Sequence, residues 1–149
     1  MTSMRKSVAP FGAGTLGVLA CLAAAACSLT SGPDERPSSA RVRVEGTTPH
    51  SLKLITSTEF YEQLNLTTNE TYAVLERSDT SLVTLPVDRT ISLGTTGSIY
   101  VELRNDLVPT ASVRMRVELD NGQRYDRSAA LSDRAALVYY WIWRDFTIR

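Results

Sequence analysis

From Ala40 onward, apolar and polar residues alternate along the chain with a period of two. Alternation of this kind places one face of a strand on a core and the other face in water. No stretch after Cys27 keeps a 3.6-residue apolar period through three helical turns. The pattern therefore predicts an all-β fold, a single antiparallel, immunoglobulin-like β-sandwich of about seven or eight strands over residues 40–149. The clearest alternating runs are 42–44, 52–54, 60–66, 99–103 and 113–119.

Three short segments between the runs are expected to be turns. A three-residue loop at Asp120–Gly122, with Gly122 left-handed, sets Val117 opposite Tyr125 and keeps both side chains on the buried face. We also expect a turn at Arg77–Asp79 and a hairpin loop at Gly94–Gly97, because turn-forming residues interrupt the apolar pattern there.

The last strong run, 137–143, is apolar on both of its faces. Such a strand is expected either to lie centrally, covered on both sides, or to present an aromatic stripe to a partner. In the second case Tyr140, Trp141 and Trp143 would form an interaction surface. The pattern resumes on the opposite parity at Phe146, which suggests a bulge after Arg144.

The first 26 residues differ from the rest of the chain. Arg5 and Lys6 precede an uncharged apolar stretch that extends to Ala26, which is the shape of a secretory signal. Residues 27–39 are small and polar, and they include Pro33 and Pro37. Proline breaks helices and these residues offer little to bury, so we expect a disordered linker as far as Ser39.

The end of the apolar stretch, Ala24-Ala25-Ala26 followed by Cys27, resembles the lipobox of bacterial lipoproteins. The resemblance implies that Cys27 receives a diacylglyceryl group and becomes the new N-terminus, with Cys21 as a second candidate. It also implies a place in the cell envelope, on the outer membrane if the bacterium has two, because serine follows Cys27. A plain signal peptide and an uncleaved anchor are the alternatives.

The charge balance argues against a nucleic-acid partner. Sixteen basic and sixteen acidic residues cancel in the whole chain. The first 26 residues contain Arg5, Lys6 and no acid, so the remainder holds 14 basic and 16 acidic residues, a net charge of −2. No basic excess is left to track a phosphate backbone.

Few residues offer catalytic chemistry. His50 is the one histidine, no cysteine follows Cys27, and zinc needs three or four nitrogen or sulfur ligands. We therefore expect neither a metal nor a cofactor, and we expect His50 to be a solvated residue of a turn. Carboxylates could still act in pairs, but we interpret them as solvated charges. The candidates are Asp120, Asp126 and Asp133 near the predicted hairpin, and Glu59 and Glu62 three residues apart.

A second resemblance concerns the turns after Leu85. Leu85-Pro86, Asn105 and the Asp120/Gly122 pair follow in the order found in small β-sandwich envelope proteins of the MmpS-like type, which accompany export pumps. The cysteine pair common in that type is absent here. Our first hypothesis is a lipid-anchored, non-enzymatic module that binds or scaffolds another envelope protein.

The alternative hypothesis is a small envelope hydrolase or carbohydrate-binding domain. Its site would use Asp120, Asp126 or Tyr125 in loops. A cleft that joins two carboxylates to exposed aromatic side chains would favour this alternative. A sandwich with fully paired acids would favour the first hypothesis.

Overall fold

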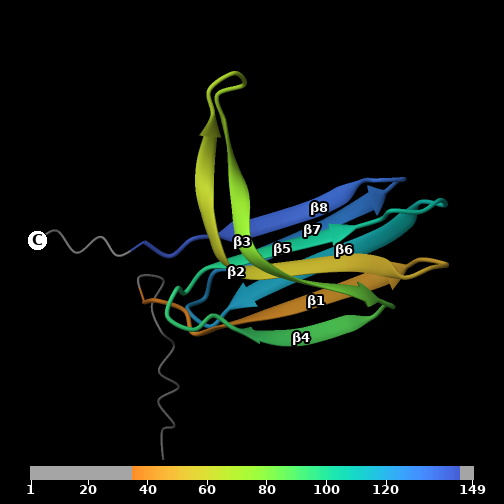
Figure 1. Ribbon diagram of the computed structural model, residues 1–149. Coiled ribbons are helices and arrows are strands. Elements are labelled where there is room, and N and C mark those ends of the chain that lie inside the picture. The colour runs from red at the N-terminus through yellow and green to blue at the C-terminus, as the bar shows by residue number, and fades with distance from the viewer. Residues whose placement is uncertain (1–34, 145–149) are drawn as a thin grey trace, which may run out of the picture.

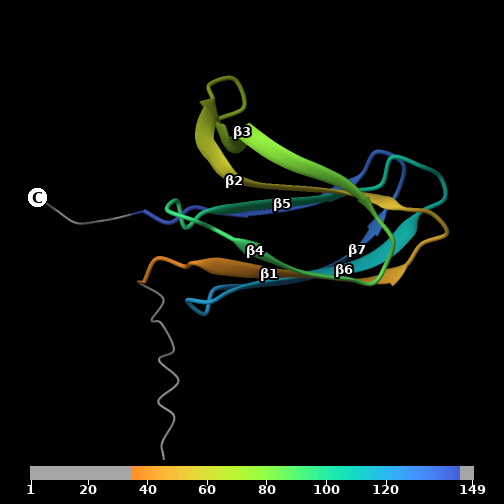
Figure 2. The same ribbon diagram turned by 60° about the horizontal axis from the view of Figure 1, so that its bottom comes forward.

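The computed structural model describes residues 35–144, which form eight strands in two antiparallel four-stranded sheets (Figure 1). The first sheet has the order β4-β1-β6-β7 and the second has the order β3-β2-β5-β8. The two sheets pack face to face (Figure 2), so the predicted all-β sandwich is confirmed. The strands are β1 (Ser39–Thr47), β2 (Leu52–Asn65), β3 (Glu70–Val83), β4 (Val87–Ser92), β5 (Ile99–Arg104), β6 (Ala111–Leu119), β7 (Arg124–Leu131) and β8 (Ala136–Trp141).

The core lies between the sheets and is built from the alternating residues. Val42 and Val44 on β1 are fully buried, as are Ile99, Val101 and Leu103 on β5. Burying one such side chain contributes about 1.5–3 kcal/mol, so a period of two along several strands is enough to specify the inner faces. The remaining buried apolar residues of β2 and β6 are Leu52, Leu54, Ala111, Val113, Met115, Val117 and Leu119.

The hairpin between β6 and β7 has the predicted form. Val117 is paired with Tyr125. The Leu119 N–H donates to the Gln123 carbonyl across 2.9 Å, which leaves the three residues Asp120–Gly122 in the loop. Gly122 has a φ of 91°, a conformation that L side chains rarely adopt. The buried face therefore sets the register, and glycine permits the turn.

The hairpin of β2 and β3 is longer than the sandwich. A bulge between Thr56 and Phe60 bends it, and the distal part stands away from the sheets as an arm (Figures 1 and 2). The alternation of 60–66 predicted a core face there, and this is wrong beyond Phe60, because Leu64 is 48% and Leu66 is 88% exposed. The alternation is real, but β5 pairs with β2 only over Lys53–Ser57, so the second sheet does not continue under the arm.

Strand β8 lies at the edge of the second sheet, beside β5. The expectation that residues 137–143 form a central strand is therefore wrong. Leu137 is buried, Tyr139 and Trp141 pack against the core, and Val138 is exposed. The Tyr139 ring lies 4.6 Å from the ring of Tyr125 on β7, so two aromatic side chains close this side of the sandwich.

Two predicted turns have another role. Arg77–Asp79 lies inside β3, where cross-strand pairing with β2 extends the strand through turn-forming residues. Gly94–Gly97 joins β4 to β5, which belong to different sheets, so it is a crossing between sheets rather than a hairpin loop. Gly97 has a φ of 61°, and a Cβ there would lie 2.5 Å from the Arg36 side chain.

The folded domain begins earlier than Ala40. Pro37 is buried, the Glu35 carbonyl accepts a hydrogen bond from Asn121, and the Ser38 N–H donates to Asp120 across 3.0 Å. The expected disordered linker therefore does not extend to Ser39. The predicted signal segment, Cys21, Cys27 and the predicted bulge before Phe146 lie outside the described residues. Across residues 35–144, no helix has the length and apolar character needed to cross a membrane.

Candidate functional site

The arm, defined as residues 59–77 of the β2–β3 hairpin, presents apolar side chains that the core does not cover. Tyr61, Leu64, Leu66 and Tyr72 are between 44% and 88% exposed. Tyr61 pairs with Val74, and Gln63 pairs with Tyr72, so Tyr61, Tyr72 and Val74 share one face of the ribbon. A two-stranded ribbon is marginally stable alone in water, and large apolar side chains on it are typical of contact surfaces.

The arm is also acidic. Four glutamates and one arginine lie between positions 59 and 77. Glu59 makes an ion pair with Arg77 at 3.4 Å, and Glu62 makes one with Arg144. The remaining glutamates, Glu70 and Glu76, have no ion-pair partner within the described part of the chain. The exposed apolar side chains of the arm are therefore bordered by negative charge.

An aromatic cluster fixes the base of the arm to the outer face of the second sheet. The Phe60 ring lies 6.0 Å from the Tyr100 ring and 6.1 Å from the Tyr140 ring, in edge-to-face arrangements. Each such pair stabilises the structure by about 0.5–1.5 kcal/mol beyond the burial of its area. Burial and a 2.7 Å hydrogen bond to Glu102 raise the pKa of the Tyr100 hydroxyl. Tyr100 is thus a neutral structural support at physiological pH.

The bulge that directs the arm is held by a buried hydroxyl. The Ser57 Oγ donates to the Arg77 carbonyl across 2.5 Å, and it accepts from the Glu59 N–H at 3.1 Å. Ser57 therefore replaces the ladder hydrogen bonds that the irregular register loses.

A pocket of about 540 Å³ opens at the base of the arm, on the side where β3 and β4 form the free edges of their sheets. Its walls are residues 56–59 of β2, residues 77–79 of β3 and residues 89–92 of β4. The volume lies within the range of ligand-binding pockets.

Polar residues occupy inward-facing positions beside this pocket. Arg89 pairs with the buried Val42, so its side chain lies on the core-facing side of β4. Asp79 pairs with Thr56, which has the same parity as the buried Leu54. Arg89 donates to the Ser81 hydroxyl across 2.9 Å, while the Asp79 side chain has no ion-pair or hydrogen-bond partner among residues 35–144.

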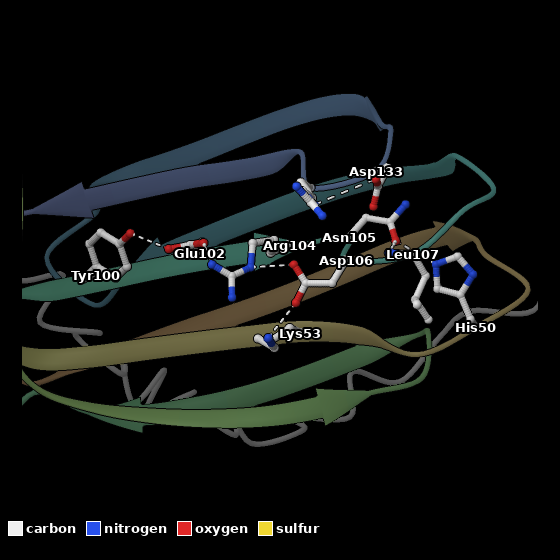
Figure 3. Close-up of polar contacts among 10 residues, drawn as sticks. His50, Lys53, Tyr100, Glu102, Arg104, Asn105, Asp106, Leu107 and Asp133 are labelled. Atoms are coloured by element: carbon white, nitrogen blue, oxygen red, sulfur yellow. Dashed lines mark hydrogen bonds and ion pairs between the residues drawn. The ribbon is translucent and has the colours of Figure 1, made fainter.

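A chain of ion pairs crosses the outer face of the second sheet away from the arm (Figure 3). Asp106 accepts from the Lys53 Nζ at 2.5 Å and pairs with the Arg104 Nε at 2.8 Å. The hydrogen bond from Lys53 and the charge of Arg104 hold the pKa of the Asp106 carboxyl below its usual range. These charges satisfy one another, so the chain has a structural role.

His50 is not the solvated turn residue that we expected. It is half-buried, and its Nε2 lies 2.7 Å from the Oδ1 of the fully buried Asn105 (Figure 3). The Asn105 amide nitrogen donates to the carbonyls of Pro109 and Leu131, which orients Oδ1 as the acceptor. His50 Nε2 is therefore the donor, and the histidine ties the β1–β2 turn to the loop after β5.

Each carboxylate that was a candidate for paired chemistry has a local partner. Burial alone would raise the pKa of Asp120, but hydrogen bonds from Ser38 and Ser39 outweigh it and hold that pKa below its usual range. No group of three or more His, Cys, Asp or Glu side chains in the described part of the chain could hold a metal ion. The other pairs are Asp126 with Arg114, Asp133 with Arg134, Glu59 with Arg77 and Glu62 with Arg144.

The three aromatic residues of the predicted interaction surface point to different neighbours. Tyr140 contacts Phe60 at the base of the arm, and Trp141 packs against the core. The Arg36 guanidinium lies over the Trp143 ring, 5.6 Å from its centre. All three are half-buried, so they support the arm and the N-terminal segment.

Sequence reasoning did not identify the arm. Only the structure shows the length of β2 and β3, 14 residues each where strands usually have about five or six, because turn-forming residues at Arg77–Asp79 interrupt the sequence pattern inside β3. No known family model matches the chain, and comparisons with curated proteins and with solved structures give no match. A function can therefore be proposed only from the fold and from the geometry of the arm and its pocket.

Proposed function

We propose that this protein is a lipid-anchored cell-envelope protein whose β-sandwich is a non-enzymatic binding module that presents the arm to another envelope protein. The observation that carries this proposal is the arm itself, a ribbon beyond the sandwich with Tyr61, Leu66 and Tyr72 exposed. The acidic border of the arm favours a partner whose apolar patch is flanked by basic residues.

Anchoring is the part of the proposal that rests on Cys27. Cells are labelled with radioactive palmitate, and the wild-type chain is compared with Cys27→Ala and Cys21→Ala. We expect Cys27→Ala to lose the label and Cys21→Ala to retain it. The reverse result would move the anchor to Cys21, and label retained in the double variant would refute lipid anchoring.

Binding through the arm is tested by site-specific crosslinking in intact cells. A photoreactive phenylalanine replaces Tyr72 on the arm or, as the control, the exposed Thr84 between β3 and β4. We expect a discrete crosslinked protein from position 72 only, and its yield falls when Leu66→Asp is added. Equal crosslinking from both positions, or none from position 72, would refute the role of the arm.

A further inference from the structure

We infer that the pocket at the base of the arm binds an extended, lysine-containing segment of a polypeptide, which adds as a strand to the free edge of β4. This inference rests on the proposed binding function and names the form in which the partner is recognised.

The outer edge of β4 can accept a further strand. Strand β4 pairs with β1 over six consecutive residues without a register shift, and among residues 35–144 no strand pairs with its other edge. Alternate residues of such a strand direct N–H and C=O groups away from the paired side. These groups are a template for strand addition, which gives affinity through the main chain.

The facing wall is less suited to pairing. Strand β3 also has a free edge, but its residues 77–79 lie beside the bulge, where the register with β2 is irregular. The side chains of this wall, rather than its main chain, therefore face a strand bound on β4. The Arg89–Ser81 hydrogen bond joins the two edge strands beside the pocket. The residues of β4 that follow Arg89, residues 90–92, line the pocket and are where the added strand would pair.

The chemistry of the walls indicates what the added strand carries. Hydroxyl groups of Thr56, Thr58 and Ser78 can donate to or accept from polar side chains. Glu59 is shared with Arg77, whereas the Asp79 side chain has no partner within residues 35–144. The inward-facing charge of β4 itself, Arg89, already donates to the Ser81 hydroxyl. A strand that brings a lysine to Asp79 on the facing wall pairs this carboxylate, and a strand without a lysine leaves it unpaired.

The test uses the full-length protein in detergent and a blocked hexapeptide of alternating threonine and lysine. Binding is measured by fluorescence anisotropy and located by hydrogen exchange with mass spectrometry. We expect exchange to slow in residues 87–92, and Asp79→Asn to weaken binding about tenfold, as the loss of one charge-assisted hydrogen bond implies. Asp133→Asn is the matched control, since it removes the same charge from the loop between β7 and β8, which lie at the opposite edges of the two sheets, and it should leave affinity unchanged.

A peptide methylated on every backbone nitrogen keeps its lysines but cannot pair as a strand, so we expect it not to bind. Equal binding of both peptides, no slowing of exchange in residues 87–92, or equal affinity of Asp79→Asn and Asp133→Asn would overturn the inference. If the peptide fails while crosslinking from position 72 persists, the inference fails and the proposed function stands.

Discussion

Asn105 is a buried side chain that joins two loops and the end of β7 at one end of the sandwich. It has no exposed surface, and its amide takes part in four hydrogen bonds. Its Oδ1 accepts from His50 at 2.7 Å and from the Leu107 N–H at 3.1 Å. Its Nδ2 donates to the carbonyls of Pro109 at 3.2 Å and Leu131 at 2.8 Å. The substitution Asn105→Ala removes all four bonds at once.

The loss in the free energy of unfolding depends on how many of the groups left without a hydrogen bond are accessible to water. A net intramolecular hydrogen bond contributes about 0.5–1.5 kcal/mol, and a buried group left unpaired costs about 1–3 kcal/mol. The bond to the Leu131 carbonyl is buried, whereas the other three are partly accessible. We therefore expect Asn105→Ala to lower the free energy of unfolding by about 3 kcal/mol, mostly through the Leu131 carbonyl.

The measurement is equilibrium unfolding in urea, followed by tryptophan fluorescence. His50→Ala is the control, because it removes one of the four bonds and should cost about 1 kcal/mol. A loss below about 1 kcal/mol for Asn105→Ala, or equal losses for the two variants, would show that the amide does not join the loops as argued.

Four further predictions concern other parts of the sandwich. The Tyr125 hydroxyl is buried and has no hydrogen-bond partner among the described residues, so Tyr125→Phe should leave stability unchanged or raise it slightly in urea unfolding. Burial raises the pKa of Tyr139 to about 12, so the unfolded chain loses this proton first. Stability should therefore fall as the pH rises from about 10 towards 12, and it should fall less in Tyr139→Phe. The lowered pKa of Asp120 gives stability that is lost as the pH falls through its folded-state value, and Asp120→Asn should reduce that acid loss in a pH titration. Truncation before Trp141 should abolish the cooperative unfolding transition, because it shortens β8 and exposes the core.

The residues that alternate in sequence were enough to predict the fold class and the inner faces of most strands. Val42, Val44 and Met115 are buried because a one-residue shift would move every apolar side chain into water. The same reasoning gave the register of the β6–β7 hairpin, where Gly122 and the pairing of Val117 with Tyr125 are local features. A few neighbouring residues determine local features of this kind.

The neighbours of each strand were decided by the tertiary structure. Alternation with a period of two indicates which face of a strand is buried, but it does not indicate which strands lie beside it. Most of the apolar run 137–143 therefore lies in the edge strand β8, which ends at Trp141. The alternation after Phe60 continues into the arm, where β5 no longer pairs with β2. The inward positions of Arg89 and Asp79, and the pocket between them and the arm, depend on long-range pairings of β1 with β4 and of β2 with β3. Such pairings join residues far apart in the chain, so only the folded sandwich brings their side chains together.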